Sequence, residues 1–246
     1  AIVAMAREFA PGIRCFTIDI AGGPDSGSEN DLPYAQMVAK HLKVPLDVIS
    51  VDSSQVASDI EKMVYMLDEP QADPASLNVL YISRLARDQG IKVLLSGVGG
   101  DDLFSGYRRH LAIGIENAWT WLPGKVRETV SNSFNSLDSR QHWARRLKHF
   151  LVNATGDENN RMAGYFCQVS EQDILPLYSD EFINELENYR ATQPILDFVD
   201  SIPRERTKLQ KMLSLDQRFF LSDHNLNYTD KMSMAAGVEV RVPFLD

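Results

Sequence analysis

Short apolar runs alternate with helical segments through the first hundred residues. Runs rich in β-branched residues predict strands at 13–20, 44–51 and 91–95. Apolar residues spaced by three and four predict helices at 1–9, 32–42, 56–67 and from 77 to Gly90, where the glycine ends the helix. The face over 1–9 has no capping residue before it, so the chain is expected to begin within an element. Strands alternating with helices indicate an α/β fold with a doubly wound parallel sheet, whose ligands bind at the carboxyl ends of the strands.

The strand pattern fades after residue 107. Helical periodicity covers 143–152, 180–189 and 206–221, and prolines separate these segments. We therefore expect an α/β part over 1–107 and a mostly helical part over 108–246.

One loop has the composition of an anion site. The strand at 91–95 stops at Ser96-Gly97-Val98-Gly99-Gly100, which is followed by Asp101 and Asp102. Three glycines in four positions let the backbone take positive φ and bring N–H groups close to a phosphate. Carboxylates beside a bound phosphate usually hold magnesium between them. The alternative is a tight turn whose aspartates cap a short helix.

Composition narrows the class of protein. With 246 residues, 44% of them hydrophobic, the chain can bury a full core. The net charge of −9 and the lack of basic runs argue against nucleic acid or an anionic membrane as partner. No apolar run approaches a membrane span, and the two cysteines suggest neither a disulfide scaffold nor a zinc site. A cytoplasmic protein is expected.

Two motifs carry a family resemblance. The string Ser-Gly-Val-Gly-Gly-Asp-Asp-Leu-Phe-Ser-Gly-Tyr at 96–107 resembles the Ser-Gly-x-Gly-x-Asp-Glu-Leu-Phe-x-Gly-Tyr signature of the synthetase domain of asparagine synthetases. Residues 230–234, Asp-Lys-Met-Ser-Met, and 237–246, Gly-Val-Glu-Val-Arg-Val-Pro-Phe-Leu-Asp, resemble a second block of that family. The resemblance implies the adenine nucleotide alpha hydrolase-like fold, also called the ATP pyrophosphatase type. It also implies that residues 1–107 bind the nucleotide and that residues 108–246 contribute to the substrate side.

The resemblance also implies a reaction that uses ATP and Mg²⁺. ATP adenylates the side-chain carboxylate of aspartate, pyrophosphate leaves, and ammonia from a glutaminase domain displaces AMP to give asparagine. A homodimer is compatible with this assignment. By position, the nucleotide side comprises Ile18, Ser96, Gly97 and Gly99. Asp101 matches a magnesium ligand, and the aspartate side comprises Asp230, Lys231, Glu239 and Arg241.

The sequence departs from the family at several points. Val98 occupies a position where the family carries an acidic residue linked to forming the adenylate. Either another acidic group takes over that role, such as Asp102 or the loop around Asp68, or the substrate differs. We expect the glutaminase domain and the pyrophosphate loop of the family to be absent from residues 1–246. The segment Ala-Gly-Gly-Pro-Asp-Ser at 21–26 looks like that loop, but it contains a proline and polar residues follow where a helix should begin. We therefore expect residues 1–246 alone to form no asparagine.

Three functions remain open from the sequence. The first is asparagine synthesis. The second is the same adenylating chemistry on another carboxylate, as in related amidotransferases and β-lactam synthetases. The third, motivated by Val98, is a nucleotide-binding module without catalysis. The residue pair Glu239 and Arg241 has a simpler interpretation as well, because charges two apart on a strand can pair with each other at the surface.

Overall fold

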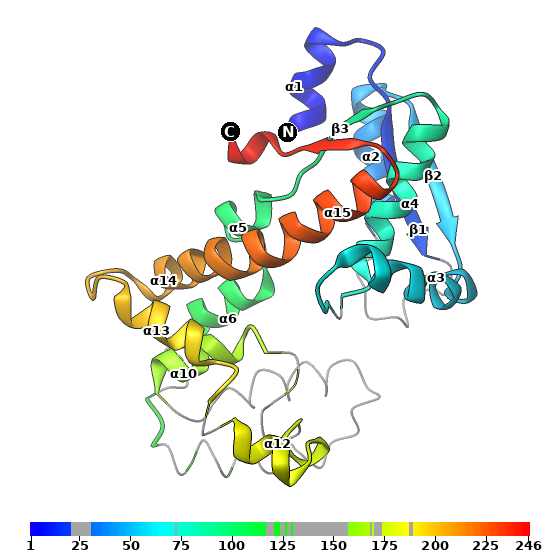
Figure 1. The fold of residues 1–246 in the computed structure, drawn as a ribbon. Helices are drawn as coiled ribbons and strands as arrows, with labels where there is room; N and C mark the ends of the chain where they lie inside the picture. The colour runs from blue at the N-terminus through cyan, green and yellow to red at the C-terminus, as the bar shows by residue number, and fades with distance from the viewer. Residues whose placement is uncertain are drawn as a thin grey trace. The chain divides into compact units, whose positions relative to one another are not determined.

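Two compact units make up the described chain (Figure 1). The computed structural model describes residues 1–20, 31–71, 73–116, 121–123, 126, 129, 157–167, 169, 174–186 and 189–246. The first unit contains residues 1–100 and 222–246, and the second contains residues 101–221. The C-terminal segment, red in Figure 1, thus belongs with the N-terminal elements, whereas the sequence-based division grouped it with the helical part.

Among the described residues of the first unit, four short strands pair in parallel. β1 (Cys15–Ile20) lies beside β2 (Leu46–Val51), in register over six residue pairs. β3 (Val93–Leu95) lies beside β4 (Glu239–Arg241), which comes from the far end of the chain (Figure 1). The α/β class and the parallel strand direction are therefore confirmed.

The described strands do not join into one sheet. The β1–β2 and β3–β4 pairs are separate two-stranded sheets. An open cavity adjoins both, lined by Cys15 and Phe16 of β1 and by all three residues of β3. Two apolar side chains of β3, Val93 and Leu95, are 43% and 46% exposed, which is unusual for a strand of a parallel sheet. A continuous doubly wound sheet therefore stays a prediction.

Helices pack around these strands close to where the hydrophobic spacing predicts them. They are α1 (Ile2–Phe9), α2 (Leu32–Leu42), α3 (Ser53–Leu67) and α4 (Ala75–Asp88). A further helix of this unit, α15 (Asn227–Ala235), lies outside the segments that this spacing predicts. Asp52 caps α3 by accepting the backbone N–H of Gln55 at 2.8 Å. The sequence predicts where each helix lies better than the residues at which it begins and ends. Capping residues such as Asp52 are polar, so they are not part of the apolar pattern.

The core of the first unit combines both ends of the chain. Its fully buried side chains come from β2, α3, α4 and α15: Val51, Met63, Leu67, Leu77, Leu80, Tyr81 and Met232. Met232 is 0% exposed and packs among residues that precede it by more than 150 positions. Residues 222–246 are therefore part of the same hydrophobic core, and they bring β4 to β3.

The described second unit is helical, as the sequence predicts for this region. It contains α5, which begins at the unit boundary (Gly100–Phe104), and α6 (Arg108–Ile115), α10 (Glu158–Gly164), η2 (Leu175–Leu177), α12 (Asp180–Glu185), α13 (Gln193–Ser201) and α14 (Lys208–Leu215). The buried residues of its hydrophobic cluster are Ile113, Met162, Val199, Met212 and Leu215. The predicted helix at 143–152 and the loop at 21–26 lie outside the described residues. No described helix is both long and apolar enough to cross a bilayer.

A buried ion cluster accompanies this second core. Glu116 is 1% exposed and accepts hydrogen bonds from Arg161 Nε and, at 2.9 Å, from Lys208 Nζ. Burial alone would raise the pKa of Glu116, but the bonds from the two cations outweigh it and lower that pKa.

The predicted helix at 206–221 changes its winding part of the way along. A capping box between Thr207 and Gln210 starts α14. From Asp216 the chain continues as η3 (Asp216–Leu226), a π-helical segment that leads into α15. Hydrophobic spacing does not predict this change, because side chains four apart remain on similar faces in both windings. π-Helical segments are rare and occur often at functional sites.

Tyr81 makes the stability of the first unit depend on pH in the alkaline range. Its hydroxyl donates to Asp59 Oδ2 at 3.0 Å, and burial together with this carboxylate raises the pKa of Tyr81 to about 12. An unfolded tyrosine titrates near 10, so the contribution of Tyr81 to stability is complete below pH 10 and is lost as the pH rises toward 12. Tyr81→Phe should lower the free energy of unfolding at pH 7 by about 1 kcal/mol and flatten its decline above pH 10.

Urea unfolding measured across pH 8 to about 12 tests this assignment. The matched control is Tyr65→Phe, which removes a hydroxyl from a side chain that is 88% exposed. An equally steep alkaline decline in Tyr81→Phe and in the unmodified protein would contradict the assignment.

Candidate functional site

The glycine-rich segment forms a compact turn at the carboxyl end of β3. The Ser96 N–H donates to the Arg241 carbonyl at 2.8 Å, which extends the β3–β4 pairing by one bond. The Gly100 N–H then donates to the Gly97 carbonyl at 3.1 Å and closes the turn. Within it, Ser96 Oγ accepts the Val98 N–H at 3.2 Å, so the hydroxyl hydrogen can be donated elsewhere. Gly97 is exposed, and no atom lies within 4 Å of where its Cβ would be.

The second sequence motif packs directly on this turn. Gly99 has φ +88°, and a Cβ there would lie 2.8 Å from Leu245 Cδ2. A Cβ on Gly100 would lie 3.2 Å from Phe244 Cε2. The Pro-Phe-Leu part of the second motif, η4 (Pro243–Leu245), therefore leaves room only for glycine at position 99. The structure thus brings together two motifs that are more than 130 residues apart.

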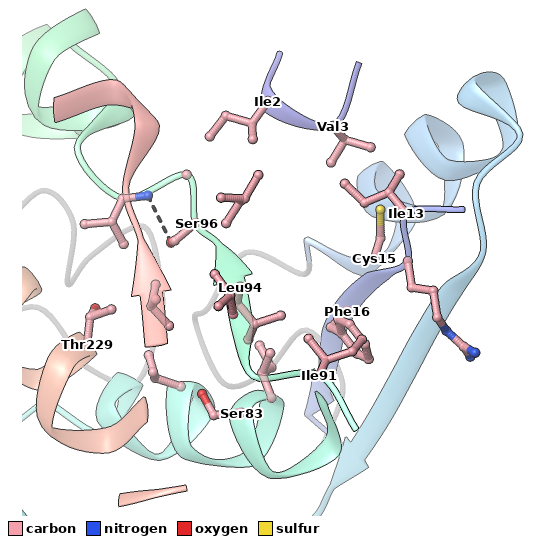
Figure 2. A pocket seen from close by; sticks show the side chains of 18 of the residues that line it. Ile2, Val3, Ile13, Cys15, Phe16, Ser83, Ile91, Leu94, Ser96 and Thr229 are labelled. Atoms are coloured by element: carbon pink, nitrogen blue, oxygen red, sulfur yellow. Dashed lines mark hydrogen bonds between the residues drawn. The ribbon is translucent and has the colours of Figure 1, made fainter. Parts of the chain in front are cut away.

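An open cavity of about 660 Å³ begins at the turn (Figure 2). Ser96, Gly97 and Val98 line it, and so do Ile13 and Phe16. The other lining residues come mainly from α1, α4, β3 and α15 and are mostly apolar. Figure 2 shows Leu94 and Ser96 on one side of the space and the β1 residues opposite them. The volume lies within the range typical of small-molecule sites.

Two buried hydroxyls on this cavity have no hydrogen-bond partner within the described chain. Ser83 of α4 is 0% exposed and Thr229 of α15 is 4% exposed, and both line the cavity (Figure 2). Buried polar groups are usually paired, so these two hydroxyls suit a cavity that takes a ligand or water. Neither residue stands out from the sequence alone. Thr229 immediately precedes the second motif, but the sequence does not show which cavity a helix faces.

Glu239 and Arg241 lie on the same face of β4 and pair with each other. Arg241 Nε donates to Glu239 Oε1 at 2.9 Å, and the two side chains are 62% and 56% exposed. The glutamate raises the pKa of Arg241. This is the surface pairing that a two-residue spacing on a strand permits. Because the bond uses Nε, the terminal nitrogens of the guanidinium can still grip a carboxylate.

Lys231 is held by the acidic loop that follows α3. Its Nζ bonds to Asp68, which lowers the energy of the ammonium form and raises the pKa of Lys231. Glu69 accepts a 3.4 Å bond from Asn227, and Asp73 lies 3.4 Å from His224. We call these three contacts the loop–helix contact. The acidic loop is thus paired with side chains of η3 and α15.

The residues that bond the acidic loop are placed by helical geometry. Positions 224, 227 and 231 follow helical spacing along η3 and α15, so their side chains lie along one side of that segment. Asp230, the neighbour of Lys231, is exposed. The sequence could have suggested this arrangement from the three acidic residues and the spacing of their partners.

The remaining predicted residues do not line the cavity. Ile18 pairs with Ile49 between β1 and β2, and its side chain packs on the first core. Asp101 is exposed on α5 and begins the second unit. Asp102 is 1% exposed and accepts the Tyr107 hydroxyl at 3.2 Å. Burial raises the pKa of Asp102, against the lowering effect of that hydrogen bond.

These contacts bear on what could replace the missing acid at Val98. Asp102 is enclosed in the second unit, and Asp68 is bonded to Lys231, so both carboxylates already have partners in the structure. Among the described residues no group of three metal-ligating side chains gathers. Magnesium is usually held by one or two carboxylates together with water and phosphate oxygens, so a single exposed Asp101 fits that mode of binding.

Comparison with known proteins assigns the fold and motifs to a family. The asparagine synthase family model matches residues 1–246, and the chain therefore belongs to this family. It is 27% identical over 246 residues to a putative glutamine-hydrolysing asparagine synthetase of Mycobacterium bovis, covering all of this chain and 36% of that protein. It is 25% identical over 261 residues to the glutamine-hydrolysing asparagine synthetase 1 of Bacillus subtilis, covering all of this chain and 37% of that protein.

A further relative carries a different name. The amidase chyE of Penicillium rubens is 25% identical over 250 residues, covering 95% of this chain and 35% of that protein. The chain thus spans just over a third of the length of these relatives.

The close approach of the two motifs at Gly99 can be tested by substitution. Gly99→Ala adds both a strained positive φ and an overlap with Leu245, whereas Gly90→Ala, at φ +79° with nothing within 4 Å, adds the strain alone. We expect Gly90→Ala to lower the free energy of unfolding by about 1 to 2 kcal/mol, and Gly99→Ala to lower it by about 1 to 3 kcal/mol more. Urea denaturation measures both.

The overlap itself is tested in a double variant. Adding Leu245→Ala to Gly99→Ala should recover the extra loss, because it removes the side chain that the new Cβ meets. Equal losses in the two glycine variants would show that Leu245 does not press on the turn.

Proposed function

We propose that residues 1–246 form the ATP-using part of an amide-forming ligase of the asparagine synthetase kind. The observation that supports this most is the packing of the second motif on the glycine-rich turn, at the mouth of the 660 Å³ cavity. A nucleotide turn and an exposed Glu–Arg pair on the adjacent strand provide an anion site beside an amino acid site. Membership of the asparagine synthase family supports the same reaction class.

On the nucleotide side, the turn would bind the α-phosphate and the cavity would take the apolar part of the nucleotide. Ser96 Oγ can donate to a phosphate oxygen, because its lone pair already accepts the Val98 N–H. Open space around Gly97 lets a ligand oxygen reach the backbone closely. Asp101 would hold Mg²⁺, which neutralises phosphate charge when bound. The backbone contact of Ile18 with the adenine ring stays a prediction, because Ile18 is not among the residues that line this cavity.

On the carboxylate side, the exposed pair on β4 would bind an amino acid. The Arg241 guanidinium would grip the α-carboxylate in a bidentate pair, and Glu239 would accept from the α-amino group. Asp230 and Lys231 would lie on the same side, with Lys231 exchanging part of its contact with Asp68 for the substrate.

The proposed chemistry has two balanced steps. A side-chain carboxylate oxygen of aspartate attacks the α-phosphorus of ATP, and the bond to the departing pyrophosphate breaks. Ammonia, supplied by a glutaminase domain, then attacks the β-carboxyl carbon; AMP leaves with the bonding electrons and one ammonium proton is released. A carboxylate oxygen is a poor leaving group, so the first step makes the second feasible.

A second candidate is the same adenylation applied to another carboxylate. Valine at position 98, on the wall of the cavity, favours it because this position is acidic in the asparagine synthetases that the sequence resembles. One relative is named an amidase rather than a synthetase, which also supports a different acceptor.

Exchange of labelled pyrophosphate into ATP by the complete protein distinguishes these functions. Exchange that requires Mg²⁺ and aspartate supports asparagine synthesis, and exchange with another acid from a panel supports the second candidate. Nucleotide binding without exchange for any acid would overturn adenylation and leave the non-catalytic module.

Substitution of the two cations tests the carboxylate side. Arg241→Gln and Lys231→Gln should each raise the KM for the carboxylate about tenfold or more, because each removes a charged hydrogen bond to the substrate. Lys62→Gln is the matched control, since Lys62 forms a similar ion pair with Asp59 at 3.0 Å in the same unit. Unchanged KM values in both motif variants would contradict the proposed carboxylate site.

A further inference from the structure

A buried carboxylate in the second unit anchors the helix that follows the first motif. Asp216 is 0% exposed and lies where α14 passes into η3. It accepts a bond from Arg109 Nε at 2.7 Å and one from His110 Nε2. Both donors are in the first turn of α6, so Asp216 fixes the start of this helix across a separation of more than 100 residues.

The same arginine lies against the aromatic end of the motif. The Arg109 guanidinium lies 4.0 Å from the centre of the Tyr107 ring and 4.2 Å from that of Phe220. Tyr107 in turn packs edge-on against Phe220 and donates its hydroxyl to Asp102 at 3.2 Å. A continuous path of contacts thus runs from the buried Asp216 through Arg109 and Tyr107 to the motif.

The turn just before Tyr107 also positions Asp101. Ser105 has φ +62°, and the Gly106 N–H donates to the Asp101 carbonyl at 2.9 Å. A Cβ on Gly106 would lie 1.9 Å from Asp101 Oδ1, so the carboxylate rests directly on this glycine. Any shift of Tyr107 would move the turn, and with it the surface that holds the Asp101 side chain.

We infer that Asp216 is a positioning residue for the metal ligand Asp101, acting through Arg109 and Tyr107. The inference rests on the proposed function for the role of Asp101, and on geometry for the path. Removing the carboxylate leaves a buried cation without its partner, so Arg109 would seek water and release Tyr107. Groups that orient a metal ligand typically change metal affinity about 10- to 100-fold when they are altered.

The test compares Asp216→Asn with a control that is equally buried. In Glu116→Gln the altered carboxyl is likewise buried and bonded to two basic side chains, Arg161 and Lys208, neither of which belongs to residues 101–107. Asp216→Asn should raise the Mg²⁺ concentration for half-maximal pyrophosphate exchange about tenfold or more, with the KM for the carboxylate unchanged. Glu116→Gln should lower stability and leave the Mg²⁺ dependence unchanged.

Hydrogen exchange of the amides of residues 101–107 supplies a readout that needs no activity. It should rise in Asp216→Asn and not in Glu116→Gln. If the unmodified protein catalyses no pyrophosphate exchange, the proposed function fails, while hydrogen exchange still decides whether Asp216 orders this turn. Arg109→Lys, which keeps the charge and loses the planar fork, replaces Asp216→Asn if that variant does not fold.

Two results would overturn the inference. One is an unchanged Mg²⁺ dependence in Asp216→Asn, and the other is an equal change in Asp216→Asn and Glu116→Gln. Either result would show that the buried carboxylate supports only the stability of the second unit.

Discussion

The contact between the glycine-rich turn and the C-terminal motif is the constraint on which the first unit depends. A glycine at positive φ lies against Leu245, and the adjacent strands β3 and β4 share a backbone ladder that continues to Ser96. The turn has its shape because a segment from the far end of the chain packs against it. The packing of the C-terminal motif, the backbone conformation of the turn and the position of the cavity mouth therefore depend on the same contact.

Charge reinforces this arrangement without depending on deep burial. Lys231 is half exposed and is oriented by Asp68, while Glu239 and Arg241 orient each other on β4. Exposed pairs of this kind add little stability, since solvent screens them. Their physical effect is to hold long side chains in defined positions at the surface. Such groups can exchange one carboxylate partner for another at modest energetic cost.

The sequence predicted element types and the two motifs well, and their connections less well. Helical spacing located α2, α3 and α4, and the residue string around Ser96 indicated the turn. The pairing of β3 with β4 could not be read from periodicity, because pairing depends on which distant segment completes the core. The sequence also did not show that Asp102 is buried beside Tyr107, that Ser83 and Thr229 face the cavity, or that η3 is π-helical, since all three depend on tertiary neighbours.

The discontinuous first unit has a consequence for how the chain acquires its structure. Met232 completes a core begun by Leu77 and Leu80, with the whole of the second unit lying between them in the chain. During synthesis the first hundred residues therefore leave the ribosome with that core unfinished and its apolar side chains accessible to chaperones. Early formation of the intervening helical unit would shorten the effective tether between the two halves and lower the entropic barrier to their joining.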